Sequence, residues 1–398
     1  MSTGPHARIS TALRPEPDVV LHSRRPDGTR AGAVLLGLLV VSACGGGNGP
    51  IQIGVAANFT DPLSLPIRYG AQLAAEEINA AGGINGRPIA LVEREDYNDA
   101  DSAVVVATDF YNSPVVAVIG HGFSGPTLAA APVYNGGIDP LLEIAPAASA
   151  PAVTDAGLFT FRVCPSDLAH GSALAHWARE RLGLLRGAVF YTNSEYGRGI
   201  RSAFETEFAS LQGTVIGAYP YLGDTPDVGP YLDLLTRNKR AQFMVIAGYD
   251  ADARTILTEA QNKDLAIPTM GGDGLEQIAL AGPVANGTYV TSSYFPQTDT
   301  PANRRFVEAY RARFPTAGDP NGSGAAAYDA VYMLRATMLR VGTERQAIRD
   351  GFAGIGTATP AYEGAMGTIA FDTNGDVPSL KIYVGEVRDG VMQLAEGQ

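Results

Sequence analysis

Six polar residues each follow a short apolar run of the chain and could together bind a small polar molecule. They are Asn58, Ser124, Ser149, Tyr196, Tyr249 and Asp273. Hydroxyls can donate to a carboxylate, and a carboxylate can accept from an ammonium. The Val- and Ile-rich runs before them are typical of strands buried in a parallel sheet, where ligands bind beyond the carboxyl ends of the strands. The set therefore predicts a ligand cleft, although a polar residue in any one loop is ordinary.

A glycine pattern in the stretch VVAVIGHGFSGPTLAAA, residues 115–131, has the G-x-G-x-x-G spacing of a dinucleotide site. In a Rossmann unit this pattern belongs to the first strand–helix turn, whereas here it follows about the third strand. The apolar run at residues 31–44 also predicts an export signal, and an exported chain has little access to NAD. We interpret the glycines as a tight turn and predict that the protein uses no cofactor.

Patterns for metal binding and nucleophilic catalysis are absent from the sequence. It contains no H-E-x-x-H, C-x-x-C or G-x-S-x-G spacing. Residues 372–376, DTNGD, resemble half of a calcium loop, but Val377 stands where Gly is needed and Tyr383 where Glu would complete it. A hairpin turn is the preferred interpretation of this run. We therefore predict a protein that is not an enzyme and holds no metal.

Residues 1–43 are predicted to be an N-terminal extension and export signal. The apolar run AGAVLLGLLVVSAC, which ends at Cys44, would rise about 20 Å as a helix, less than the roughly 30 Å of a membrane core. It fits the apolar region of a signal peptide. Its small-small-Cys ending, followed by three glycines, resembles a bacterial lipoprotein signal, which implies lipidation of Cys44 and makes residues 44–50 a linker. A plain cleavable signal with an incidental Cys is the alternative.

Composition predicts a globular chain that does not bind nucleic acid. The 398 residues are 45% hydrophobic and 18% charged, enough to bury more than one core. Of 29 basic and 41 acidic residues, five and three precede Cys44, which leaves 24 basic and 38 acidic residues. This acidic excess repels nucleic acid.

From Ile51 onward, apolar runs alternate with amphipathic helical patterns, which is typical of parallel α/β units. Strands are predicted for IQIGVAA, PIALVER, VVAVIG and PLLEIA, then for GAVFYT, GTVIGAY, QFMVIAG and IPTM. A strand pair is predicted around GTIAFDTNGD and LKIYVGEV. Because no low-complexity linker separates the two series, we expect the chain to pass between two lobes more than once. We predict lobe I from residues 51–163 plus 293–376 and lobe II from residues 164–292 plus 377–398.

Beyond these patterns, the sequence resembles the periplasmic solute-binding proteins of branched-chain amino acid ABC transporters, the group of the leucine/isoleucine/valine-binding protein. The resemblance covers residues 51–387. It is carried by YGAQLAAEEINAAGGINGRPIALVERED, VIGHGFSGPT, EIAPAASAPAVT, FRVCPSD, NSEYGRG, GYDADA and GGDG, in this order. It implies the type I periplasmic binding protein fold: an α/β protein with two parallel-sheet lobes joined by a three-strand hinge, which close on a ligand.

The resemblance also implies roles for individual residues. Ser124, Ala148 and Ser149 would bind the carboxylate of the ligand and part of its ammonium. Tyr196 and Tyr249 would contact the ligand from the second lobe, and Asp273 would pair with the ammonium. Asn58 and Phe59 lie in a loop that departs from the family, because two prolines replace its Gly-rich turn. Since that loop helps to define the side-chain pocket, a leucine-like ligand does not follow.

We therefore expect a monomeric, lipid-anchored binding subunit of an ABC importer. It would capture an amino acid or related small organic acid in the periplasm, or at the outer face of the cytoplasmic membrane, and deliver it to permease and ATPase subunits. The alternative is a sensory binding protein that reports the solute to a membrane receptor. An exported hydrolase is disfavoured because no nucleophile and base can be paired in the sequence.

Overall fold

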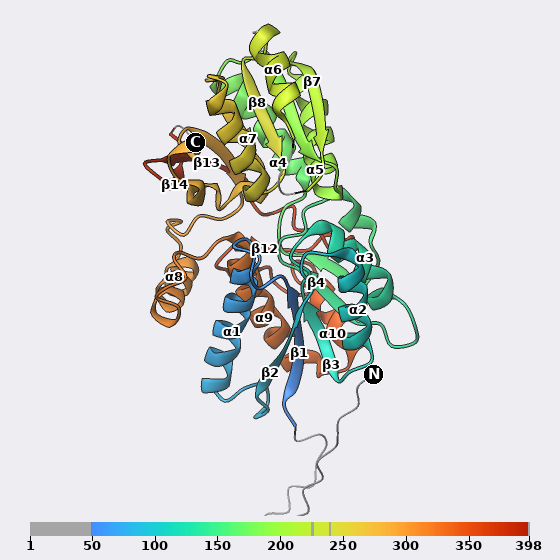
Figure 1. The fold of residues 1–398 in the computed structure, drawn as a ribbon. Coiled ribbons are helices and arrows are strands. Elements are labelled where there is room, and N and C mark those ends of the chain that lie inside the picture. Colours follow the sequence, from blue (N-terminus) through green and yellow to red (C-terminus); the bar gives the residue numbers. More distant parts are fainter. Residues whose placement is uncertain (1–48, 224–226, 239, 397–398) are drawn as a thin grey trace, which may run out of the picture. The chain divides into compact units, whose positions relative to one another are not determined.

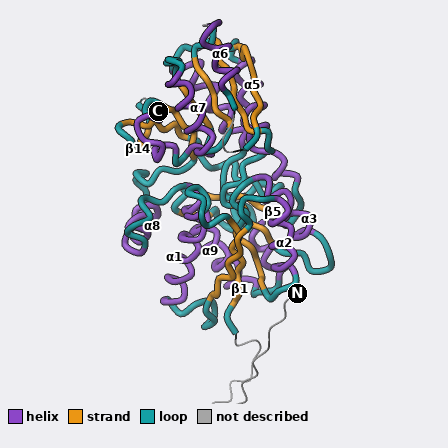
Figure 2. The backbone as a smooth tube through the Cα atoms, viewed as in Figure 1, coloured by secondary structure: helices purple, strands orange, loops and turns teal. Residues whose placement is uncertain are grey.

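The computed structural model describes residues 49–223, 227–238 and 240–396. The predicted export signal and the lipidation site Cys44 lie outside the described residues. Among the helices of the described part, none combines the length and apolarity that a membrane span requires. Strands and helices alternate along the described chain and form two large sheets with helices packed against them, besides a small two-stranded sheet (Figures 1 and 2).

The first sheet is parallel and has the strand order β2-β1-β3-β4-β5. Its strands are β1 (Ile51–Ala57), β2 (Ile89–Glu95), β3 (Val115–Ile119), β4 (Leu142–Ala145) and β5 (Thr160–Arg162). The apolar runs of β1, β3 and β4 are almost fully buried because helices cover both faces of the sheet.

The helices on the first sheet come from both ends of the described chain. On one face lie α1 (Leu65–Ala80), α8 (Pro301–Arg313), α9 (Gly322–Val341) and α10 (Arg345–Ala353), and on the other α2 (Ala100–Tyr111) and α3 (Ser124–Asn135). The short helix η1 (Pro151–Asp155) follows β4, and a small hairpin pairs β11 (Tyr362–Gly364) with β12 (Gly367–Ile369). We refer to this part as lobe I.

The second sheet has the order β14-β13-β10-β9-β8-β6-β7 and forms lobe II. Its strands are β6 (Arg186–Thr192), β7 (Thr214–Tyr221), β8 (Phe243–Ala247), β9 (Thr269–Gly271), β10 (Thr288–Ser292), β13 (Tyr383–Arg388) and β14 (Val391–Leu394). Its helices are α4 (Asp167–His176), η2 (Trp177–Arg181), α5 (Glu195–Ser210), α6 (Gly229–Asn238), α7 (Asp250–Asn262), η3 (Asp273–Leu275) and η4 (Ile278–Ala285). β13 runs antiparallel to both β10 and β14, whereas the other neighbours are parallel.

The chain passes between the two sheets three times. Residues 163–166 connect β5 to α4, residues 293–300 connect β10 to α8, and residues 370–382 connect β12 to β13. Val377 and Leu380, in the third connection, still pack in the core of lobe I.

The predicted strand pair near the C-terminus is wrong. The strand within GTIAFDTNGD is β12, which pairs with β11, whereas the strand within LKIYVGEV is β13, which pairs with β10 and β14. The DTNGD run does form a tight turn, in which Gly375 N–H donates to the Asp372 carbonyl. The two strands lie in different lobes because the third connection separates them. A local pattern can predict a turn but not the partner of the strand that follows it.

Asp329, in the middle of α9, holds the turn between β11 and β12. Its fully buried carboxylate accepts hydrogen bonds from the backbone N–H groups of Ala365 and Met366, at 2.9 and 2.8 Å. Burial raises the pKa of Asp329 to about 7, against the lowering effect of the two N–H groups. The carboxyl therefore binds a proton in the folded protein at pH values where the unfolded chain has released it.

We predict that Asp329→Asn flattens the pH dependence of folding stability. Between about pH 4, where an unfolded Asp titrates, and pH 7, the folded state holds the extra proton, so this group lowers the free energy of unfolding by up to about 1.4 kcal/mol for each unit of rising pH. Urea unfolding at pH 5, 6 and 7 measures the slope. Asp319→Asn, an exposed carboxylate before α9, should leave it unchanged. Equal slopes in wild type and Asp329→Asn would contradict the prediction.

Candidate functional site

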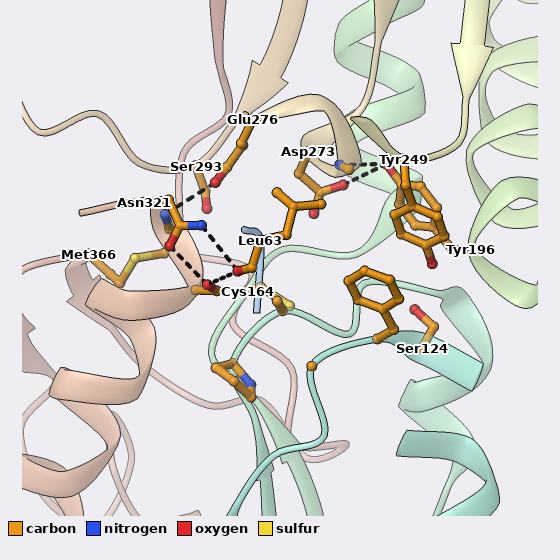
Figure 3. Close-up of a pocket in the computed structure, with 17 residues that line it drawn as sticks. Leu63, Ser124, Cys164, Tyr196, Tyr249, Asp273, Glu276, Ser293, Asn321 and Met366 are labelled. Carbon is orange, nitrogen blue, oxygen red and sulfur yellow. Dashed lines mark hydrogen bonds between the residues drawn. The ribbon is translucent and has the colours of Figure 1, made fainter. Parts of the chain in front are cut away.

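A cavity of about 50 Å³ lies at the carboxyl ends of strands from both sheets, which is where open α/β sheets bind ligands (Figure 3). Lobe I contributes residues that follow β1, β3 and β4, together with the start of α9 and the turn at Met366. Lobe II contributes residues that follow β6, β8, β9 and β10. The lining is therefore assembled from both lobes.

Four helices begin at this cavity. Ser124 opens α3, Tyr196 lies in the first turn of α5, Tyr249 precedes α7, and Asn321 precedes α9. The starts of α5 and α9 have side-chain caps, because Ser194 Oγ accepts from Gly197 N–H at 3.2 Å and Asn321 Oδ1 accepts from Gly324 N–H at 3.0 Å. The start of α3 has no side-chain cap. The first N–H groups of a helix lack intrahelical partners, and the helix dipole favours negative charge there. The cavity can therefore bind an anionic group even though none of its described lining residues is Lys or Arg.

Asp273 and Tyr196 form a hydrogen-bonded unit in the wall contributed by lobe II. The Tyr196 hydroxyl donates to Asp273 Oδ1 at 3.0 Å and accepts from Gly274 N–H at 2.8 Å. His170 Nε2 lies 3.5 Å from Asp273 Oδ2, and burial lowers the pKa of His170, which keeps its imidazole neutral near pH 7. Asp273 therefore faces the cavity as a carboxylate whose orientation is fixed by a tyrosine rather than by a cation.

An aromatic stack joins the two lobes beside the cavity. The Phe123 ring, from the loop after β3, stacks on Tyr249 with the ring centroids 4.3 Å apart and the planes at 2°. Tyr249 in turn stacks on Tyr196, with centroids 5.0 Å apart. Such contacts favour the arrangement in which the lobes meet, because separating them would expose the ring faces to water.

The structure brings together four of the eight residues predicted to bind ligand. Ser124, Tyr196, Tyr249 and Asp273 all line the cavity. Ser124 Oγ also accepts from Ala150 N–H at 3.2 Å, which ties the loop after β3 to the loop after β4.

The other four predicted residues do not line the cavity. Ala148 and Ser149 are fully buried behind it. Asn58 folds back on its own loop, where Oδ1 accepts from Thr60 N–H at 3.0 Å, and Phe59 N–H donates to Glu95 at 3.0 Å. The first loop reaches the cavity through Leu63 instead.

Several lining residues were not predicted from the sequence. They are Leu63, Phe123, Cys164, Glu276, Ser293, Asn321, Ser323 and Met366, with backbone from neighbouring glycines. Glu276 lies three residues after Asp273, a spacing that places two side chains on the same side of a helical turn. The sequence could therefore have indicated Glu276 as a second carboxylate of the cavity. The Asn-Gly-Ser run at Asn321 was another, because Asn is a favoured helix cap. Cys164 is free and buried, and burial raises the pKa of its thiol.

Asp167, the first residue of α4, lies behind the cavity wall and is fully buried. Burial and the nearby negative charge of Asp273 raise the pKa of Asp167 well above its usual range, against lowering effects of Ser149 and Arg162. Asp167 therefore favours its protonated form in the folded protein.

This chain is similar to known proteins along most of its length. The family model of the periplasmic binding proteins matches residues 50–391. Leu/Ile/Val-binding protein homolog 1 of Brucella suis is 29% identical, over 84% of this chain and 89% of that protein. A leucine-, isoleucine-, valine-, threonine- and alanine-binding protein of Pseudomonas aeruginosa is also 29% identical, with the same coverage.

Solved structures are similar over most of the chain. An ABC transporter substrate-binding protein of Desulfitobacterium hafniense in complex with Leu is 29% identical, covers 87% of this chain and 100% of that chain, and gives a TM-score of 0.75. A branched-chain amino acid transporter substrate binding protein of Streptococcus pneumoniae in complex with isoleucine is 26% identical, covers 87% and 99%, and gives a TM-score of 0.78.

Proposed function

This chain belongs to the periplasmic binding protein family, and from that premise we propose that it is the substrate-binding subunit of an ABC importer for an amino acid or related small organic acid. The predicted α/β fold of two lobes with parallel-stranded sheets is confirmed by its match to solved structures of the type I fold. Proteins of this family bind solutes and are not enzymes, which supports a binding role here.

The proposal rests on one observation: two parts of the same cavity favour ligand groups of opposite charge. The uncapped start of α3, from lobe I, favours an anionic group, whereas Asp273, from lobe II, favours a cationic one. A zwitterion that leaves water needs a partner for each charge, because an unpaired buried charge costs several kcal/mol. We therefore assign the ligand carboxylate to Ser124 and the start of α3, and the ammonium to Asp273.

Binding would be coupled to the closing of the lobes. Tyr196 and Tyr249 contact a ligand held by lobe I only when lobe II has approached, and the stacking of Phe123 on Tyr249 favours that approach. A ligand that contacts both lobes shifts the equilibrium towards the closed form, with the three connections between the sheets acting as the hinge. A membrane permease can then recognise the closed form.

We further propose that the protein acts outside the cytoplasm as a monomer held at the membrane by lipid on Cys44. The support comes from the extracytoplasmic setting of the family and from the lipoprotein-like sequence around Cys44. Permease and ATPase subunits are the partners that an importer requires.

A thermal-shift screen of the form that begins at Gly45 tests the proposal. We expect an amino acid at one hundred times its Kd to add about 2.7 kcal/mol to the free energy of unfolding. If only carboxylates that lack an amine stabilise the protein, the ligand is not an amino acid, but the protein still binds a small organic acid. Chemical turnover of a ligand by the purified protein would overturn the proposed binding role.

A further inference from the structure

The loop after β9 presents two carboxylates to the same cavity. Asp273 begins the 3₁₀ turn η3 and Glu276 follows it, with Glu276 N–H donating to the Asp273 carbonyl at 3.0 Å. In a 3₁₀ turn the side chains of residues three apart leave on the same side. Both carboxylates line the cavity, Asp273 next to Tyr196 and Glu276 next to Asn321 (Figure 3).

Glu276 is held in place by groups that leave acceptor capacity on its carboxylate. Oε1 accepts from the Ser292 hydroxyl at 2.5 Å, and Oε2 accepts from Gly322 N–H, at the start of α9, at 3.2 Å. Each carboxylate oxygen has two lone pairs, so each can accept one further hydrogen bond. These two bonds fix the side chain at the border between the lobes, with its remaining acceptor sites available to a ligand.

The cavity contains more negative than positive charge. Among its described lining residues, Asp273 and Glu276 are acidic and none is Lys or Arg. The buried guanidinium of Arg162, which lies behind the wall, is paired with Asp376 at 2.7 Å. If the ligand ammonium pairs with Asp273, an aliphatic ligand side chain would leave Glu276 without a cation. Burial and the charge of Asp273 raise the pKa of Glu276 to about 7, against the lowering effects of the hydrogen bonds from Ser292 and Gly322.

The surroundings of Glu276 suit a long side chain with a polar end. Leu63 and Met366 provide apolar surface, and Asn321 and Ser293 are polar. Glu276 and Asn321 also border a second cavity of about 510 Å³, so the space continues past the carboxylate. Long cationic side chains lay their methylene groups along apolar surface and place the charge at a polar group.

We propose that Glu276 determines ligand specificity, and that the ligand is an amino acid whose side chain ends in an ammonium or guanidinium group. The inference rests on the proposed amino acid binding and adds the class of side chain. Glu276 pairs with the terminal cation, while Asp273 pairs with the α-ammonium.

Calorimetric titration with matched ligands tests this inference. Lysine and norleucine differ by the terminal amine, and ornithine and arginine vary the reach of the cation. We expect at least one of the three basic amino acids to bind at least tenfold more tightly than norleucine and leucine. Glu276→Gln should reduce that affinity at least tenfold and leave norleucine binding unchanged or stronger. Glu308→Gln, the same chemical change at an exposed position of α8, is the matched control and should alter neither.

A second measurement on the wild type needs no variant and so does not depend on how Glu276→Gln folds. A ligand cation lowers the pKa of Glu276 from about 7, so binding at pH 7 should release protons, detected as a dependence of the binding enthalpy on the buffer. If leucine or norleucine binds as tightly as the basic amino acids, or no proton is released, the inference fails and amino acid binding stands. If no amino acid binds, the proposed function itself fails.

Discussion

Arg162→Ala is expected to lower the free energy of unfolding by about 3–5 kcal/mol, because it leaves a carboxylate and several buried acceptors without their cation. Arg162 is 1% exposed and ends β5. Its guanidinium forms an ion pair with Asp376 at 2.7 Å and donates to the carbonyls of Ser149 and Ala150 at 3.1 and 3.0 Å. One side chain therefore joins the end of β5, the loop after β4 and the third connection between the lobes.

Urea unfolding of wild type and Arg162→Ala measures this effect, with the slope against urea checked for constancy. Arg304→Ala is the matched control, since it also removes the arginine of an Arg–Asp pair, but both side chains of that pair are largely exposed. Exposed pairs contribute about 0–1 kcal/mol. If the two variants lose equal stability, the buried network around Arg162 does not have the role that we assign to it.

Asp273→Ala is expected to weaken amino acid binding at least 100-fold, about 3 kcal/mol, because the ligand ammonium would enter the closed cavity without its carboxylate. The folded protein itself should tolerate the change. Among the described contacts Asp273 has no cationic partner, since the nearby His170 is neutral, and the charge of Asp273 opposes the ionisation of Asp167 and Glu276. Melting of the ligand-free variant checks this tolerance.

A matched ligand separates charge from shape in this experiment. The 2-hydroxy acid that corresponds to the bound amino acid lacks the ammonium, so its affinity should change much less in Asp273→Ala. Asp273→Asn keeps an acceptor for the Tyr196 hydroxyl and should weaken amino acid binding almost as much as alanine. An equal loss for amino acid and hydroxy acid would show that Asp273 acts by holding the loop after β9, and would refute the ammonium assignment.

Local sequence patterns predicted most of the elements that position the cavity. The apolar runs that became β1, β3, β6 and β8 lie within a residue of their predicted bounds, because buried parallel strands need continuous Val- and Ile-rich stretches. The residues that follow such strands lie at one edge of the sheet, whatever conformation their loops adopt. For that reason Ser124, Tyr196, Tyr249 and Asp273 could be chosen from the sequence.

Loop conformation was not predictable in the same way. Asn58 and Phe59 also follow a strand, but the Asn58 side chain accepts hydrogen bonds within its own loop, and Leu63 reaches the cavity instead. The direction of a loop side chain depends on hydrogen bonds that compete over a few residues. The end of a strand therefore predicts where a loop lies, but it does not predict which residue of the loop faces the ligand.

The sequence by itself determined the two α/β series, the acidic composition and the strand-end residues, since these depend on local periodicity and residue type. Only the tertiary structure decided that Phe123 stacks on Tyr249 and that Glu276 bonds to Gly322. Asn321 donates to the Leu63 carbonyl, a contact between residues 258 positions apart. Such contacts depend on which distant segments the folded chain brings together, both within a lobe and between the lobes, and no local pattern records which segment a side chain will meet.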